Sequence, residues 1–176
     1  EEQRADPMPS GNCGNESTRC RSDKVARRAP RAPGRRRRRR RSLRAAAILL
    51  KGMTVEYLFN RTYKIKPGQF FLFHAAAGGV GLLACQWARA IGAKMIGTVS
   101  TDEKARHAKK LGCEFTINYS NEDVAKRVRE ITEGGGVSVV YDGVGKSTFE
   151  NSVKCLETRG MMISFGNASG ALDPIN

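Results

Sequence analysis

Between residues 70 and 165 the chain alternates short apolar runs with helix-like segments, and this alternation constrains its fold more than any other feature. The apolar runs are continuous rather than polar at every second position, which is typical of strands buried on both faces. Glycines follow several of the intervening segments, as expected at helix C-termini. The sequence therefore predicts an α/β fold, a doubly wound parallel sheet with right-handed crossovers and helices on both faces.

The predicted elements are joined by short connections. Strands are expected at residues 70–74, 94–99, 115–118, 137–141 and 161–165, and helices at residues 80–91, 101–111, 121–132 and 146–156. A helix-favouring run begins at Ala45 and extends to Leu58, and we expect Gly52 to interrupt it. Pro67 and Gly68 predict a turn that leads into the first strand.

Positive charge is concentrated in the first quarter of the chain. The formal net charge is +14, but residues 1–44 hold 15 Lys and Arg against 5 Asp and Glu, whereas residues 45–176 hold 16 against 12. Arg, Pro, Gly and Ser dominate residues 1–44, so little apolar surface is available for a core. We expect residues 1–44 to form a disordered basic tail and residues 45–176 to form the ordered domain.

A run of seven arginines, Arg35 to Arg41, is the most unusual feature of this tail. Such a run neutralises phosphates of a nucleic acid or acts as a localisation signal, although no aromatic residue is interleaved for base stacking. A solvated tail without function is a second interpretation. A third is that residues 1–44 are not natural protein, because GC-rich sequence translated outside its true frame gives runs rich in Arg, Ala, Pro and Gly.

Two classes of protein are disfavoured by the sequence. No run approaches the roughly 20 apolar residues that span a bilayer, and the N-terminus lacks the apolar core of a secretory signal. The five cysteines are Cys13, Cys20, Cys85, Cys113 and Cys155. Their spacing is not that of a zinc site, and their odd number does not suit a set of disulfides. The sequence therefore predicts no membrane contact, no metal site, and reduced thiols in a cytoplasmic protein.

A glycine-rich turn follows the first predicted strand directly. It reads Ala75-Ala76-Ala77-Gly78-Gly79-Val80-Gly81 and matches the dinucleotide-binding pattern, with alanine in the first glycine position. The lack of a side chain at Gly78 allows the backbone to approach a pyrophosphate, and Gly81 allows the helix to pack closely on the strand. The helix N-terminus adds free N–H groups and a positive dipole end. The alternative is that these small residues serve only the packing of strand and helix.

The end of the second predicted strand favours one dinucleotide over another. Sites selective for NAD usually carry an acid there, about 20 residues after the glycine turn, which holds the ribose 2′-OH. Here the strand ends at Ser100 and Thr101, and Lys104 follows in the first turn of the next helix. Small hydroxyl residues and a lysine suit a 2′-phosphate, so the sequence predicts NADPH rather than NADH. The alternative is that Lys104 is an ordinary surface lysine.

These motifs, preceded by Leu50-Lys51-Gly52-Met53-Thr54, resemble the quinone oxidoreductase branch of the medium-chain dehydrogenase/reductase superfamily. Three later stretches follow in the same order, Ile117-Asn118-Tyr119, Tyr141-Asp142-Gly143-Val144-Gly145 and Ser164-Phe165-Gly166-Asn167-Ala168-Ser169-Gly170. The resemblance covers residues 45–176. It implies a truncated Rossmann-type nucleotide-binding domain from an NADPH-dependent, zinc-independent quinone reductase, usually a homodimer.

The resemblance also implies roles for individual residues, all at carboxyl ends of predicted strands, where open α/β sheets bind ligands. The residues implied for the pyrophosphate are Gly78, Gly79 and Val80, and those for the adenosine 2′-phosphate are Ser100, Thr101, Lys104 and Tyr119. The end of the fourth strand places Gly143 and Val144 beside the cofactor, with Gly143 replacing a serine of some relatives. The residues implied for the nicotinamide half are Phe165, Gly166, Asn167 and Ala168.

Two departures from the family pattern bear on activity. From the resemblance we expect residues 1–176 to lack the family's N-terminal substrate-binding domain and to end before its sixth strand. Because the substrate pocket of such enzymes lies between two domains, we expect this polypeptide to bind NADPH weakly and not to reduce quinones at a meaningful rate. Two other functions stay open, a non-catalytic nucleotide-binding module that contacts nucleic acid through Arg35 to Arg41, and a related enone or alkene reductase.

No catalytic residue is predicted. His74 lacks a carboxylate or cysteine neighbour in the sequence, so we expect a packing or strand-end residue, and His107 is expected at the surface. Asp142 is expected to pair with a lysine rather than to bind a ribose, and Cys85 to lie in the core. In this reaction class the cofactor supplies the hydride, and the protein supplies orientation and exclusion of water.

Overall fold

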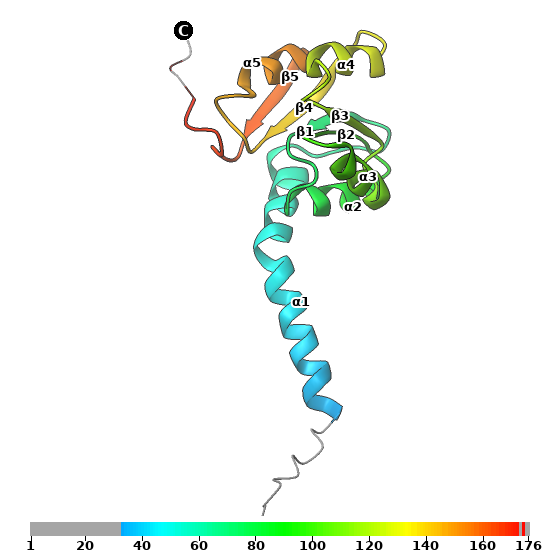
Figure 1. Cartoon of the computed structure of the whole chain (residues 1–176), viewed down its shortest axis with the longest axis vertical. Coiled ribbons are helices and arrows are strands. Elements are labelled where there is room, and N and C mark those ends of the chain that lie inside the picture. Colours follow the sequence, from blue (N-terminus) through cyan, green and yellow to red (C-terminus); the bar gives the residue numbers. More distant parts are fainter. Residues whose placement is uncertain (1–32, 173, 175–176) are drawn as a thin grey trace, which may run out of the picture.

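The computed structural model describes residues 33–172 and 174. A long helix, α1 (Pro33–Glu56), projects from the rest of the molecule and continues into a π-helical turn, η1 (Tyr57–Thr62) (Figure 1). The backbone of residues 33–44, expected as disordered tail, is therefore helical, and residues 1–32 of that tail lie outside the described residues. Gly52 does not interrupt α1, because one glycine costs a helix only about 1 kcal/mol.

Five parallel strands form one sheet in the order β3-β2-β1-β4-β5. They are β1 (Phe70–Phe73), β2 (Lys94–Val99), β3 (Phe115–Asn118), β4 (Val137–Asp142) and β5 (Leu156–Ser164). In the register of the central strands, Phe71 lies opposite Met95, and Leu72 lies opposite Val140. The predicted α/β class with a parallel sheet is confirmed.

Four helices cover the two faces of this sheet. They are α2 (Gly81–Ile91), α3 (Asp102–Leu111), α4 (Val124–Ile131) and α5 (Phe149–Cys155), with α2 beside α3 and α4 beside α5 (Figure 1). Alternate residues of strand β1 are buried on opposite faces of the sheet. Its Phe71 and Phe73 join the core under α2 and η1, whereas Leu72 between them joins the core under α4 and α5. A strand buried on both faces must be apolar at every position.

Aromatic packing fixes η1 to the sheet. The Phe59 ring meets Phe71 edge-on and lies against Tyr141, with 5.3 Å between ring centroids in both pairs. The Tyr141 hydroxyl donates to the Leu58 carbonyl oxygen at 3.1 Å, and burial raises the pKa of this phenol above its ordinary value. The base of α1 is thereby anchored under the central strands.

Several element boundaries differ from the predicted ones for local reasons. Helix α4 begins at Val124 rather than residue 121, because the Asp123 carboxylate caps it by accepting the Lys126 N–H at 2.8 Å. Helix α5 is shorter than predicted, and β5 begins at Leu156, which pairs with Val137 before a register shift. The predicted turn at Gly68 and the predicted ends of α2 and α3 at left-handed glycines are confirmed.

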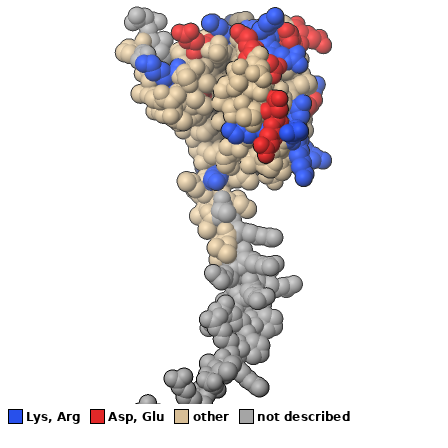
Figure 2. Space-filling model, in the orientation of Figure 1, with Lys and Arg blue, Asp and Glu red and all other residues tan. Residues whose placement is uncertain are grey.

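Charged side chains are mixed rather than segregated on the face of the domain shown in Figure 2, where acidic and basic residues alternate over the top and right-hand side. This agrees with the nearly balanced charge of residues 45–176. Across the described ranges, no helix combines the length and apolar composition required to cross a bilayer.

Candidate functional site

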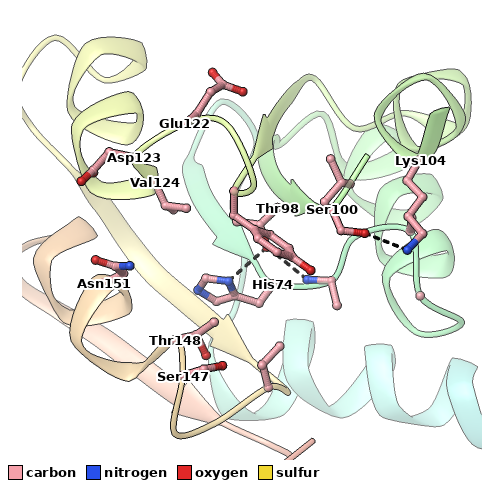
Figure 3. Close-up of a pocket in the computed structure, with 16 residues that line it drawn as sticks. His74, Thr98, Ser100, Lys104, Glu122, Asp123, Val124, Ser147, Thr148 and Asn151 are labelled. Atoms are coloured by element: carbon pink, nitrogen blue, oxygen red, sulfur yellow. Dashed lines mark hydrogen bonds between the residues drawn. The ribbon is translucent and has the colours of Figure 1, made fainter. Parts of the chain in front are cut away.

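A pocket of about 540 Å³ opens where the central strands end (Figure 3). The chain leaves β1 toward β2 on one side, whereas β4 lies on the other side of β1, so the strand order reverses here. Open α/β sheets bind ligands at such a switch point, outside the carboxyl ends of the strands. The pocket is lined by His74, Ala75, Ala77, Gly78, Thr98, Val99, Ser100, Lys104, Tyr119, Glu122, Asp123, Val124, Val144, Ser147, Thr148 and Asn151.

The glycine turn forms one wall of the pocket and joins β1 to α2. Gly78 lines the pocket, and a Cβ atom added there would lie only 3.0 Å from the Ala75 carbonyl oxygen. A Cβ atom at Gly81 would lie 2.5 Å from the Ala76 carbonyl oxygen, a backbone atom that has little room to yield. Gly81 thus provides close packing of helix on strand, and Gly78 leaves its backbone open to the pocket.

The next two turn residues lie outside the pocket lining. A Cβ atom at Gly79 would lie 2.5 Å from Lys51 Nζ, so the absence of a side chain makes room for this lysine from α1. Val80 is the N-cap of α2, and its carbonyl accepts the N–H groups of Leu83 and Ala84 at 3.1 and 2.9 Å. The start of α2 therefore combines the helix dipole with a lysine ammonium, and both favour an anion.

The end of β2 forms a second wall. Lys104 Nζ donates to the Ser100 hydroxyl at 2.8 Å, and both residues line the pocket together with the half-exposed Tyr119 (Figure 3). Thr101 is not in the lining. Its hydroxyl accepts the Lys104 N–H at 3.3 Å and caps α3, which explains where that helix begins. Three of the four residues predicted for a 2′-phosphate thus line one pocket, and the fourth positions the helix that carries the lysine.

Two acidic residues also line the pocket, and both are engaged by the protein. Glu122 accepts the Asn118 N–H at 2.9 Å and lies 3.3 Å from Arg127 Nε, while Asp123 caps α4. Among the described residues that line the pocket, Lys104 is the only lysine or arginine. These contacts hold the acids in place and leave the lysine as the cation available to an anionic ligand.

The loop after β4 forms the third wall and is fixed by Asp142. One carboxylate oxygen accepts the N–H groups of Val144 and Gly145 at 2.8 and 3.0 Å, and the other accepts the hydroxyls of Thr148 and Ser152 at 2.7 and 2.9 Å. Burial by itself raises the pKa of Asp142. The hydrogen bonds from Gly145, Thr148 and Val144, together with the positive charge that His74 carries when protonated, outweigh burial, so the pKa lies below its ordinary value. The prediction that Asp142 pairs with a lysine is wrong, because backbone amides and hydroxyl groups of the described residues bind the carboxylate instead.

The residues predicted for the nicotinamide half lie against this loop but outside the pocket lining. The Phe165 ring packs on Gly143, where a Cβ atom would lie 2.9 Å from Phe165 Cζ. A Cβ atom at Gly166 would lie 2.9 Å from the Gly143 carbonyl oxygen, which also accepts the Ala168 N–H at 3.4 Å. Asn167 lies between these two residues in the segment after β5. Gly143 and this segment therefore pack together at the edge of the site.

Sequence reasoning missed several residues of the pocket. Ser147, Thr148 and Asn151 belong to no motif, although their position just after the fourth strand places them at the carboxyl edge of the sheet. His74 and Thr98 are almost fully buried at the base of the pocket (Figure 3). Tertiary structure rather than local pattern brings these side chains to the site.

Comparison with known proteins defines the class of this domain. The chain belongs to the zinc-binding dehydrogenase family, whose family model matches residues 79–176. Within residues 33–172 and 174, no group of three or more His, Cys, Asp and Glu side chains is placed to hold a metal ion. The described residues therefore do not fit a zinc ion.

Within that family the chain has quinone oxidoreductase homologues, as the resemblance implied. It is 60% identical over 132 residues to quinone oxidoreductase 1 of Escherichia coli K12, covering 75% of this chain and 40% of that protein. It is 58% identical over 130 residues to 2-haloacrylate reductase of Burkholderia sp, covering 74% of this chain and 39% of that protein. The chain thus spans about two fifths of the length of these relatives.

Solved structures give the same result. The quinone oxidoreductase of Pseudomonas syringae pv. Tomato DC3000 matches with a TM-score of 0.74 and 61% identity, over 75% of this chain and 41% of that chain. Escherichia coli quinone oxidoreductase complexed with NADPH matches with a TM-score of 0.74 and 60% identity, over 75% of this chain and 40% of that chain. The predicted fold class and family are therefore confirmed.

Proposed function

We propose that residues 45–176 form the cofactor-binding part of an NADPH-dependent quinone oxidoreductase. The observation that carries this proposal is the pocket itself, in which the glycine turn and the Ser100–Lys104 pair face one cavity at the switch point of the sheet. The Escherichia coli quinone oxidoreductase, which is 60% identical to this chain over the matched 75%, was solved in complex with NADPH.

The residues present fit this cofactor. Gly78 leaves room for a pyrophosphate beside the N-terminus of α2, and Lys51 adds a positive charge next to Gly79. Ser100 and Lys104 offer a hydroxyl and an ammonium to a 2′-phosphate, and a lysine is a common partner of phosphate oxygens. Bound NADPH supplies a hydride to the acceptor. The assignments of Gly79, Val80, Thr101, Tyr119 and Val144 to cofactor contact are part of the same proposal.

The remaining chemistry of this chain is binding and orientation. Gly143 and the segment containing Phe165, Gly166, Asn167 and Ala168 pack together beside the pocket, and we place the nicotinamide half of the cofactor next to them. Hydride transfer requires the donor carbon and the acceptor to be held about 3 to 3.5 Å apart. A packed segment without charged side chains serves to hold the ring and exclude water.

The partners and location of the protein are part of the proposal. The resemblance to quinone oxidoreductases favours a homodimer, and Arg35 to Arg41 favours contact with a nucleic acid through charge. Cys85, Cys113 and Cys155 are free and buried in the described residues, as in proteins of a reducing compartment such as the cytoplasm. Sedimentation, salt-dependent RNA binding and cell fractionation test these three statements separately.

A second acceptor is favoured by one observation. The relative at 58% identity is a 2-haloacrylate reductase, and it matches this chain nearly as well as the quinone oxidoreductases do. The pocket described here lies on the cofactor side of the reaction, so it does not select between a quinone and an activated alkene. Both acceptors receive a hydride from the same cofactor.

A chimeric enzyme tests the proposed activity. The matching segment of Escherichia coli quinone oxidoreductase 1 is replaced by that of this chain, and NADPH oxidation is followed with a quinone and with a 2-haloacrylate. We expect quinone-dependent oxidation of NADPH, and its loss when the chimera carries Gly78→Val. A folded chimera that binds no NADPH, or that is unaffected by Gly78→Val, would contradict the proposal.

A further inference from the structure

A continuous chain of buried polar groups connects two walls of the pocket. The Ala75 N–H donates to Thr98 Oγ1 at 3.2 Å, and Thr98 Oγ1 lies 3.1 Å from His74 Nδ1 (Figure 3). On the other side of the ring, His74 Nε2 lies 2.9 Å from the Ser152 hydroxyl, which donates to Asp142 at 2.9 Å. Thr98, His74, Ser152 and Asp142 are all buried. This series of hydrogen bonds thus connects the glycine turn with the Asp142 carboxylate, which fixes the loop after β4.

The direction of each hydrogen bond follows from the carboxylate end. Asp142 already accepts two amide N–H groups and the Thr148 hydroxyl, so it acts as an acceptor and not as a donor. The Ser152 oxygen also lies 2.9 Å from the Thr148 carbonyl oxygen, another group that only accepts. The single hydroxyl hydrogen of Ser152 is therefore directed toward Asp142 or this carbonyl and not toward the histidine.

The tautomer of His74 follows from this order. Because the Ser152 hydrogen is used elsewhere, His74 Nε2 carries the proton and donates to the Ser152 oxygen. A neutral ring protonated at Nε2 is unprotonated at Nδ1, which must accept. Thr98 then donates its hydroxyl hydrogen to His74 Nδ1 and accepts the Ala75 N–H. The donors of Ala75, Thr98 and His74 therefore all point in one direction, from the glycine turn toward Ser152.

We propose that His74, held neutral with its proton on Nε2, is a positioning residue of the pocket that ties the glycine turn to the loop after β4. This role rests on the proposed function, because the two walls it joins are those assigned to the pyrophosphate and to the cofactor contact of Val144. Burial lowers the pKa of His74, and the negative charge of Asp142 opposes this only in part, which agrees with a neutral ring. His74 acts through Thr98 and Ser152 and touches no reacting atom.

The tautomer is tested directly by nuclear magnetic resonance of the full chain labelled with ¹⁵N-histidine. The chain has two histidines, and a His107→Gln variant assigns the signals of the exposed His107. At neutral pH we expect His74 to show the pattern of a single tautomer protonated at Nε2. Protonation at Nδ1, a charged ring or rapid averaging of tautomers would overturn the proposal. This spectrum needs no variant at His74 and no bound ligand.

The positioning role is tested by NADPH titration of Thr98 variants, followed by cofactor fluorescence. Thr98→Val removes the hydroxyl that links Ala75 to His74, and we expect at least a tenfold loss of affinity. Thr98→Ser keeps that hydroxyl, and we expect it to recover most of the affinity. Ser138→Ala, which removes a buried hydroxyl of β4 far from the pocket, is the matched control for stability.

Equal losses in Thr98→Val and Thr98→Ser would overturn the positioning role, because the hydroxyl would then be irrelevant. Circular dichroism of each variant verifies that the loss is not unfolding. Absence of NADPH binding by the unmodified chain would contradict the proposed function instead, and the histidine spectrum would still decide the order of protons.

Discussion

At the scale of single residues, the site depends on where side chains are missing as much as on where they are present. Gly78 exposes its backbone to the pocket, Gly79 makes room for Lys51, and Gly81 brings α2 against β1. Three neighbouring glycines thus meet three different demands. Across the pocket, Lys104 is held against Ser100 and faces the cavity as a cation.

A larger side chain at Gly78 is expected to weaken cofactor binding. Gly78→Val places a branched side chain where the phosphates are proposed to lie, and we expect at least a tenfold loss of NADPH affinity, about 1.4 kcal/mol. Fluorescence titration measures the loss, and Gly135→Val, at an exposed loop glycine, is the control. Unchanged affinity in Gly78→Val would show that the turn does not hold the pyrophosphate.

Removal of the Lys104 ammonium is expected to change the preference between cofactors. A charge-assisted hydrogen bond contributes about 1.5 to 3 kcal/mol, so Lys104→Ala should weaken NADPH binding tenfold or more and leave NADH binding nearly unchanged. Lys110→Ala, in the last turn of the same helix and outside the pocket lining, controls for net charge. Equal losses for NADPH and NADH would mean that Lys104 is only structural.

At the scale of elements, the unit formed by β1, the glycine turn and α2 carries the site. Helix α2 sits on β1 through Gly81, and its far end is closed by Gly92 in the left-handed conformation with φ of 78°. Gly81 is required because a side chain would have no space there, and Gly92 is required because its backbone is left-handed. The positions of the helix N-terminus and of the pocket wall are therefore coupled.

A methyl group at Gly81 should destabilise this unit. Gly81→Ala places a Cβ atom 2.5 Å from the Ala76 carbonyl oxygen, and overpacking of this kind costs about 1 to 3 kcal/mol. Urea unfolding followed by circular dichroism measures the change in the free energy of unfolding. Gly52→Ala in α1 is the opposite control, because alanine favours a helix interior by about 1 kcal/mol. A stable Gly81→Ala variant would show that α2 is free to move away from β1.

The elements show what could be predicted from the sequence. The strands at residues 94–99 and 115–118 have their predicted bounds, because continuous apolar runs ended by polar residues leave little choice. The start of β5 was missed, because Glu157 and Arg159 are exposed at the edge of the sheet and carry no apolar signal. The start of α4 depends on one capping carboxylate at Asp123, a signal that competes with several nearby polar residues.

The site could be predicted only in part for a similar reason. Gly78, Ser100 and Lys104 belong to local motifs whose chemistry is visible in the sequence, and all three line the pocket. Ser147 and Asn151 reach the same cavity only because the chain crosses from β4 to α5. The hydrogen-bond chain through His74 joins residues that are far apart in sequence, so no local pattern reveals it.

At the scale of the whole molecule, the stability of the fold is linked to pH through the buried polar chain. Burial keeps the pKa of His74 below its ordinary value of 6.5. As the pH falls below 6.5, His74 is therefore protonated in the unfolded chain before it is protonated in the folded chain. The pKa of Asp142 is also lowered, and its contribution to stability is lost as the pH falls below the ordinary value of 3.8 and through the folded pKa. Through both groups, a fall in pH lowers the stability of the folded chain.

Unfolding experiments at several pH values test this linkage. We expect the free energy of unfolding to fall as the pH drops below about 6.5, with a slope of at most about 1.4 kcal/mol per pH unit for the one proton of His74. His74→Gln removes the titrating ring, so its stability should vary less with pH in this range. Parallel curves for the two proteins would show that His74 takes up its proton in the folded chain as easily as in the unfolded one.

Binding of NADPH in this pocket is tested by mapping the bound cofactor on the unmodified chain. Backbone amide resonances are recorded by nuclear magnetic resonance during titrations with NADPH and with NADH. We expect NADPH to shift the signals of Gly78, Ser100, Lys104 and Val144. We expect NADH to shift the signals of Gly78 and Val144 but to have a smaller effect on those of Ser100 and Lys104. Unchanged signals at these residues under saturating NADPH, or changes confined to other parts of the chain, would contradict binding of NADPH in this pocket.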